Sequence, residues 1–152
     1  DRNLNQAAWE EAGLTHFHPL AGEGAALAVS LIRRLIRGLS WEESLMDAAR
    51  GQPDWIKNII FTKRPPHSQG GFAPDVLQAG LYFLNTSREF RQALQRSLEF
   101  AGPANYCPVL VGSLGGARWG ASQVNPSLIQ IDPGRRDALI SAADGLCRSW
   151  SS

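Results

Sequence analysis

The chain has 152 residues, of which 43% are hydrophobic and 19% charged. This is the composition of a globular protein and it excludes intrinsic disorder. The formal net charge is +1, and acidic and basic residues are interleaved along the whole length, so no basic patch indicates binding to nucleic acid or to an anionic membrane surface. The length fits one domain, which we expect to span residues 1–152.

Helix signals dominate from the start of the chain. Residues 4–11 are good helix formers and end at Gly13, and a second helix is predicted over 21–37, closed by Gly38. Within that second helix, residues 25–29 are apolar on every side. This pattern predicts that the segment is buried in the middle of a helical bundle.

The next signals mark two shorter helices and a loop. Ser40 and Glu43 have the spacing of a capping box, which predicts a third helix that stops at Gly51. The segment 54–61 is consistent with a short helix. A loop rich in proline and glycine follows over 65–71.

Helices continue to the end of the chain. Pro74 suits the first turn of a helix over 74–84, and Ser87 is predicted to cap a further helix that Gly102 ends. A final amphipathic helix is predicted over 136–150. Because strand signals are almost absent, the predicted fold class is all-α.

The segment 109–120 has an unusual glycine pattern. Gly112, Gly116 and Gly120 recur at every fourth residue and so share one face of a helix. Each glycine inside a helix costs about 1 kcal/mol relative to alanine. We therefore predict that another backbone approaches closely along this stripe.

Cysteine usage and hydropathy indicate a compartment. Cys107 and Cys147 are too few for a disulfide framework, so we expect both to be reduced in a cytoplasmic protein. Residues 85–87 match a glycosylation acceptor, which we interpret as chance because no secretory signal opens the sequence. The most apolar stretch, 25–36, contains two arginines and is too short to span a bilayer. The prediction is a cytoplasmic protein with neither a membrane segment nor a nucleic-acid partner.

Three stretches of the chain share their order and spacing with a known family. Residues 14–19 read L-T-H-F-H-P before an alanine-rich helix, and residues 72–84 form a helix before a loop. Residues 87–126 combine an S-x-E-F-x-x-A-L helix, a glycine turn, a G-x-x-x-G-A-x-x-G helix and an Asn-Pro exit. Together they resemble the ADP-ribosylglycohydrolase (DraG-like) family. The resemblance implies an all-helical bundle of which this chain is the C-terminal part.

The resemblance also implies a metal site in relatives. Members of that family are hydrolases that use two magnesium ions to cleave ADP-ribose from protein side chains or related substrates. Part of the ligand set comes from an N-terminal half, and part from a G-D-x-D-T motif directly before the glycine-rich helix. In this chain the corresponding slot reads G-P-A-N-Y, so that Pro103, Asn105 and Tyr106 replace the two aspartates and the threonine. Hard cations need several carboxylates, so we expect neither magnesium nor another cofactor.

Three residues are candidates for ligand binding: His16, Asn105 and Tyr106. The resemblance implies that the His16 position lines the ADP-ribose pocket of relatives. An amide and a phenol ring at positions 105 and 106 can contact a nucleotide-like ligand, or they fill the space that the metals leave. Two alternatives have less support. His16 and His18 form an H-x-H pair without further metal ligands, and Cys107 begins a helix without an acidic partner for a catalytic histidine. We predict no catalytic residue.

The leading functional hypothesis is a catalytically degenerate member of the family, a pseudoenzyme. It would bind a protein partner, a second copy of itself or a nucleotide-like small molecule without hydrolysing it. One alternative is an active ADP-ribosylglycohydrolase, cleaving N- or O-glycosidic bonds, that is completed by residues outside this chain. Another is a structural half-domain that pairs with a separate N-terminal chain, since the sequence starts at Asp1 rather than at methionine. We expect the chain to associate, either with itself or with a missing N-terminal partner, through a hydrophobic contact near residues 14–29.

Overall fold

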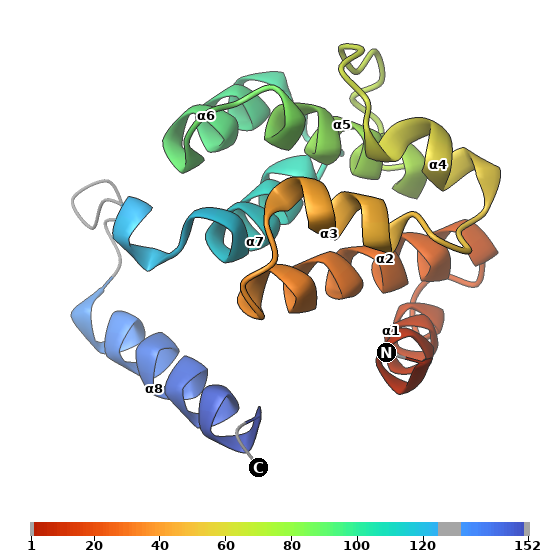
Figure 1. The fold of residues 1–152 in the computed structure, drawn as a ribbon. Helices are drawn as coiled ribbons and strands as arrows, with labels where there is room; N and C mark the ends of the chain where they lie inside the picture. Colours follow the sequence, from red (N-terminus) through yellow and green to blue (C-terminus); the bar gives the residue numbers. More distant parts are fainter. Residues whose placement is uncertain (1, 125–131, 151–152) are drawn as a thin grey trace.

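The computed structural model describes residues 2–124 and 132–150, which form eight α-helices and one short 3-10 turn (Figure 1). The helices are α1 (Arg2–Gly13), α2 (Pro19–Ile36), α3 (Trp41–Ala48), α4 (Asp54–Ile60), α5 (Ala73–Asn85), α6 (Phe90–Phe100), α7 (Cys107–Trp119) and α8 (Pro133–Trp150), and the turn is Ala121–Gln123. No strand occurs in these two ranges, which confirms the all-α fold class. None of the described helices is both long and apolar enough to cross a membrane.

Local signals set several helix ends as predicted. The Ser40 hydroxyl accepts from the Glu43 N–H at 3.2 Å, and the Glu43 carboxylate accepts from the Ser40 N–H at 2.9 Å, which confirms the capping box. The hydrogen bonds from the Ser40 hydroxyl and backbone N–H hold the pKa of Glu43 below its ordinary value. Gly38 follows α2 with φ of 88° and Gly51 follows α3 with φ of 72°, a left-handed conformation that favours glycine.

The start of α6 differs from the prediction. The residue before the helix is Glu89, whose side chain makes no capping hydrogen bond, and the Ser87 hydroxyl instead accepts from Arg96 Nη1 at 3.0 Å. The Arg96 guanidinium also lies 5.4 and 5.5 Å from the ring centroids of Tyr82 and Phe83. The prediction that Ser87 caps this helix is wrong, because its hydroxyl accepts a hydrogen bond from Arg96 instead. Through these contacts the Arg96 side chain joins α6 to the end of α5.

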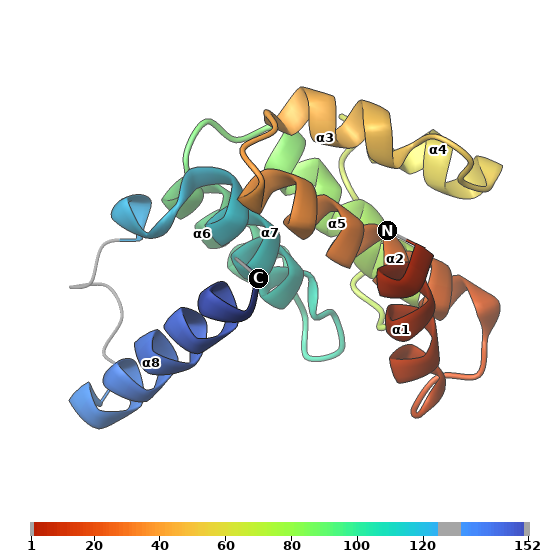
Figure 2. The same ribbon diagram turned by 60° about the horizontal axis from the view of Figure 1, so that its bottom comes forward.

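Three helices form the centre of the bundle. α2, α5 and α7 pack against one another, and each of the next four helices covers part of this group: α1 and α3 lie on α2, α4 on α5, and α6 on both α5 and α7 (Figures 1 and 2). α8 lies to one side of the bundle in both views (Figures 1 and 2). The central position of α2, α5 and α7 means that the loops before α5 and α7 meet at one end of the same core.

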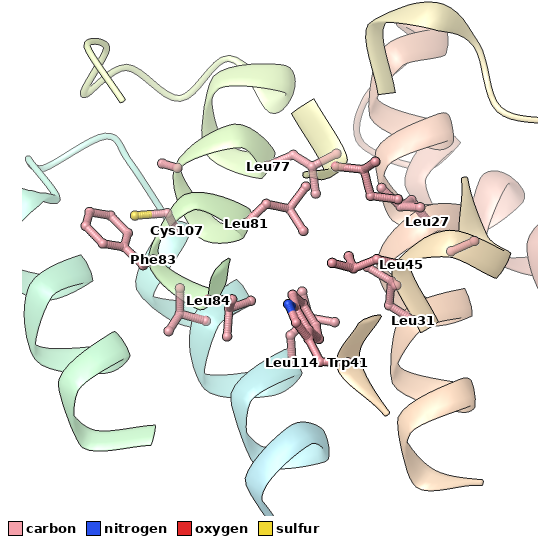
Figure 3. Packing of buried hydrophobic residues seen from close by; sticks show 14 of the residues in the cluster. Leu27, Leu31, Trp41, Leu45, Leu77, Leu81, Phe83, Leu84, Cys107 and Leu114 are labelled. Carbon is pink, nitrogen blue, oxygen red and sulfur yellow. The ribbon is translucent and has the colours of Figure 1, made fainter. Parts of the chain in front are cut away.

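The core is built mainly from leucine and isoleucine, with two large aromatic residues, Trp41 and Phe83. Side chains of α2, α3, α5 and α7 converge in it, with the Trp41 indole beside Leu114 (Figure 3). The largest fully buried side chains of the cluster are Leu27, Leu31, Ile56, Ile60, Leu81, Leu84 and Leu114. Burying each such side chain contributes roughly 1.5–3 kcal/mol, so this cluster dominates the stability of the bundle.

The apolar segment 25–29 of α2 is only partly buried. Ala26 and Leu27 are buried, but Ala25, Ala28 and Val29 are half-buried. The prediction of burial on every side is therefore wrong. One flank of this segment borders a small cavity and the other borders a groove, because α5 and α7 pack against only one face of α2.

The glycine stripe of α7 also differs from the prediction. Apart from the nearby backbone of α7 itself, no described atom would lie within 4 Å of a Cβ atom placed on Gly112 or Gly116. No other backbone therefore approaches these two positions in the described structure. The predicted close approach is wrong. The buried face of α7 is carried by its neighbours Val111, Leu114 and Gly115, which lie on a different side of the helix.

Candidate ligand-binding site

The slot 102–106 forms the turn between α6 and α7 and is held against the loop before α5. Asn105 Nδ2 donates to the backbone carbonyls of Ser68 and Gly70 at 3.4 and 3.2 Å. Gln69 Nε2 donates to the Phe100 carbonyl at 2.7 Å. These hydrogen bonds fix the end of the 65–71 loop against the start of α7.

Gly71 makes the closest backbone approach in this region. A Cβ atom at this position would lie 2.9 Å from the carbonyl oxygen of Ala104, which is closer than real Cβ atoms come to such an oxygen. Because the obstacle is backbone rather than a flexible side chain, only glycine fits here without a shift of one of the two loops.

Asn105 has a structural part in this arrangement. It is only 4% exposed, and besides its two donated hydrogen bonds its Oδ1 accepts from the Cys107 N–H at 2.9 Å, at the start of α7. The amide therefore satisfies groups of the chain itself. Its predicted contact with a ligand stays a prediction, and the geometry gives the residue a positioning role beside Tyr106.

Tyr106 is the slot residue that faces open space. Its side chain is 67% exposed and lines a cavity of about 240 Å³. The other residues that line the cavity come from α2, from the start of α5 and from α7, and are Gly24, Ala25, Ala28, Gly71, Ala73, Val76, Leu77 and Leu110. None of them carries a charge. The cavity exists because α2 presents glycine and alanine where larger side chains would fill it.

The structure does not bring His16 into this cavity lining. His16 is exposed, with its Nδ1 2.9 Å from the Thr15 hydroxyl. His18 is also exposed, and its Nδ1 accepts from the Leu20 N–H at 3.3 Å, which caps α2. The predicted ligand role of His16 stays a prediction.

The slot residues do not fit magnesium. Pro103 is exposed and offers no side-chain oxygen, the Asn105 oxygen accepts from the backbone, and Tyr106 lies beside an apolar cavity. Within the described ranges, no group of three or more His, Cys, Asp or Glu side chains is placed to hold a metal ion. A divalent cation here would lack the carboxylates that offset its charge and its lost hydration.

Cys107 is not an activated nucleophile. Its side chain is fully buried, with Sγ 3.9 Å from the Ser97 carbonyl, and this burial raises the pKa of the thiol to about 11. A helix N-terminus favours the thiolate, but here burial outweighs it. At neutral pH the residue is a protonated core side chain, which removes the alternative of cysteine catalysis.

One feature of the site was missed in the sequence. Gly24 and Ala28 are small residues four apart on α2, and both line the cavity together with Tyr106. The sequence carries this signal as an i, i+4 pair of small residues in a helix, but the burial predicted for residues 25–29 did not include it. The same pattern also allows space for a ligand.

These features define a class of protein, a helical bundle with a small apolar cavity between α2, the start of α5 and the turn that leads into α7. The family model of the ADP-ribosylglycohydrolases matches residues 1–152. The chain therefore belongs to the ADP-ribosylglycohydrolase family, as the three sequence stretches indicated. Searches of curated proteins and of solved structures give no match.

Proposed function

We propose that this chain is a non-hydrolysing binding module of its family, which holds the aromatic base of a nucleotide-like ligand against Tyr106. The observation that carries the proposal is the composition of the cavity. A phenol ring lines it, eight apolar residues complete it, and none of these is an acid or a cation. Such a lining suits a flat, uncharged ring.

The same composition argues against hydrolysis. Cleavage of a glycosidic bond requires groups that polarise the bond and activate a water, supplied by metal ions or by carboxylates. The slot residues offer neither, because Asn105 is engaged with the backbone and Pro103 has no functional group. The residues of the cavity can therefore bind a ligand, but the slot residues supply no group that would polarise the bond or activate a water.

The proposed compartment is the cytoplasm. The sequence has two cysteines, Cys107 and Cys147, which are too few for a disulfide framework. Such sparse cysteine usage is typical of proteins in a reducing compartment.

Titration with ADP-ribose, followed by calorimetry, tests the proposal. Tyr106→Ala is expected to weaken binding about tenfold or more, because stacking of a base on an aromatic ring is worth about 1–3 kcal/mol. Tyr106→Phe keeps the ring and is expected to bind like the native chain. Val109→Ala is the matched control, since Val109 is also 67% exposed on α7 but does not line the cavity.

A second pair of variants tests the location of the ligand. Ala28→Leu places a larger side chain in the cavity and is expected to abolish binding, whereas Ala7→Leu on the exposed face of α1 is expected to leave it unchanged. Binding that survives both Tyr106→Ala and Ala28→Leu would show that the ligand occupies another site. Absence of any binding by the folded native chain would refute the proposed ligand class.

A further inference from the structure

The loop 61–72, which joins α4 to α5, has little buried surface. It stands out from the bundle at the top of Figure 1. Thr62 is buried and Pro66 and Ser68 are half-buried, while every other residue of the loop is exposed. A loop with so few buried side chains depends on individual hydrogen bonds to keep one conformation.

The end of the loop next to α4 is fixed to the end of α5. Asn85 Nδ2 donates to the Thr62 carbonyl at 3.0 Å, and the Thr62 hydroxyl accepts from the Arg64 N–H at 3.2 Å. These bonds hold the first residues of the loop against the core. They do not reach residues 68–71, which lie at the Tyr106 cavity.

The other end of the loop is fixed to the turn between α6 and α7 by two side chains. One is the buried Asn105, whose amide donates to two carbonyls of the loop. The other is the exposed Gln69, whose Nε2 donates to the Phe100 carbonyl at 2.7 Å. An exposed hydrogen bond contributes little to the stability of a whole fold, so this one can break without unfolding the core.

Both attachment points lie next to the wall of the cavity. Gln69 precedes Gly71 by two residues, and Asn105 directly precedes Tyr106. Gly71 and Tyr106 both line the cavity. The attachment of the loop to the turn therefore determines where Gly71 stands relative to Tyr106, and with it the shape of the cavity.

We propose that Gln69 is a positioning residue for the ligand proposed to bind at Tyr106, on which this role depends. Its hydrogen bond to the Phe100 carbonyl holds the 61–72 loop in the conformation that completes the cavity. A ligand in the cavity contacts Gly71 and Tyr106 together, and so favours the same conformation. Two events that favour one conformation strengthen each other, so loop attachment and ligand binding are coupled in both directions.

Limited proteolysis measures the opening of the loop without any ligand. Trypsin can cleave after the exposed Lys63, whereas Pro65 protects the bond after Arg64. Gln69→Ala is expected to speed cleavage after Lys63 about twofold or more, the effect of one lost hydrogen bond on an opening equilibrium. Mass spectrometry of the fragments identifies the bond, and urea unfolding is expected to be nearly unchanged.

Two variants show whether the hydrogen bond is responsible. Gln69→Glu keeps the shape of the side chain but removes the donor, and is expected to behave like Gln69→Ala. Gln95→Ala is the matched control, because Gln95 is also exposed and its Nε2 donates to Glu99 Oε1 at 2.9 Å, away from the loop. It is expected to be cleaved at the native rate. Equal cleavage of the native chain and Gln69→Ala would overturn the proposal.

Titration with ADP-ribose tests the coupling. Gln69→Ala is expected to weaken the affinity about twofold or more, because the conformation that completes the cavity is then only partly populated. Gln95→Ala is expected to bind like the native chain. Saturating ADP-ribose is expected to slow cleavage of the native chain after Lys63.

The failure of the coupling differs from the failure of the proposed function. Binding of ADP-ribose by the native chain, with unchanged affinity in Gln69→Ala or with no protection of Lys63, would overturn the role of Gln69 and leave ligand binding at Tyr106 in place. No binding by the folded native chain would refute both.

Discussion

Gly80→Val is expected to lower the free energy of unfolding by about 1–3 kcal/mol, the usual effect of overpacking a core. Gly80 is buried on α5 where this helix packs against α7. A Cβ atom there would lie 2.8 Å from Leu110 Cδ2 and 3.3 Å from its Cγ. The whole Leu110 side chain, and with it α7, must move to admit the two methyl groups of valine.

Gly116→Val is the matched control for this experiment. It is the same substitution inside a helix. A Cβ atom at Gly116, however, has no described neighbour within 4 Å apart from the nearby backbone of α7 itself. Valine has a slightly better helix propensity than glycine, so we expect no loss of stability or a gain of a few tenths of a kcal/mol. Urea unfolding of both variants measures the difference. A loss at Gly116 as large as that at Gly80 would show that a backbone does cover the glycine stripe.

Asn85→Ala is expected to lower the free energy of unfolding by about 2–4 kcal/mol, because it leaves several half-buried groups without partners. Asn85 Nδ2 donates to the carbonyls of Ile60 and Thr62 at 3.1 and 3.0 Å. Its Oδ1 accepts from the Trp41 indole N–H at 2.9 Å. One amide therefore joins α3, the end of α4 and α5.

Two further variants separate these hydrogen bonds from a general effect of substitution. Asn85→Asp keeps an acceptor for Trp41 but places a carboxylate against two carbonyl oxygens, so we expect at least as large a loss. Asn58→Ala removes an exposed asparagine of α4 and is expected to change stability by no more than about 0.5 kcal/mol. Thermal and urea unfolding report both. A loss of under about 0.5 kcal/mol for Asn85→Ala would contradict the bridging role.

The geometry at Asn85 argues against a glycan on this side chain. A glycan replaces one of the two Nδ2 hydrogens, so in the folded chain it would remove one of the hydrogen bonds to the carbonyls of Ile60 and Thr62. The sequence shows the Asn-x-Ser pattern, but it does not show the partners. They lie 23 and 25 residues away along the chain. Because they are backbone carbonyls, which every residue has, the residue types at those positions do not reveal them.

Most helices were predictable because their signals are local. The capping box at Ser40 and the left-handed glycines after α2 and α3 each depend on a few neighbouring residues. The glycine stripe was not interpretable in the same way. A spacing of four residues identifies a face of α7, but it does not tell whether that face meets a neighbour, and here the contact lies on the side of Val111 and Leu114.

The candidate site was predictable in part. Tyr106 was a candidate because of the resemblance to the family motif, and it lines a cavity in the structure, while its ligand role stays a prediction. The structural role of Asn105 was not predictable, because its hydrogen-bond acceptors are carbonyls in the 65–71 loop. His16 lies outside the cavity lining. The family resemblance indicated which position in the chain to consider, but it did not show which residues surround that position in the fold.

We propose that this member of the family binds its ligand through an apolar cavity and not through metal ions. The most direct test is the affinity of the native chain for ADP-ribose with excess magnesium and with a chelator. We predict the same affinity in both conditions, because no described carboxylate cluster is available to hold the cation and the slot offers only Pro103, Asn105 and Tyr106. An affinity that requires magnesium, and that falls when Asn105 is changed to alanine, would contradict the claim and restore a metal-dependent site.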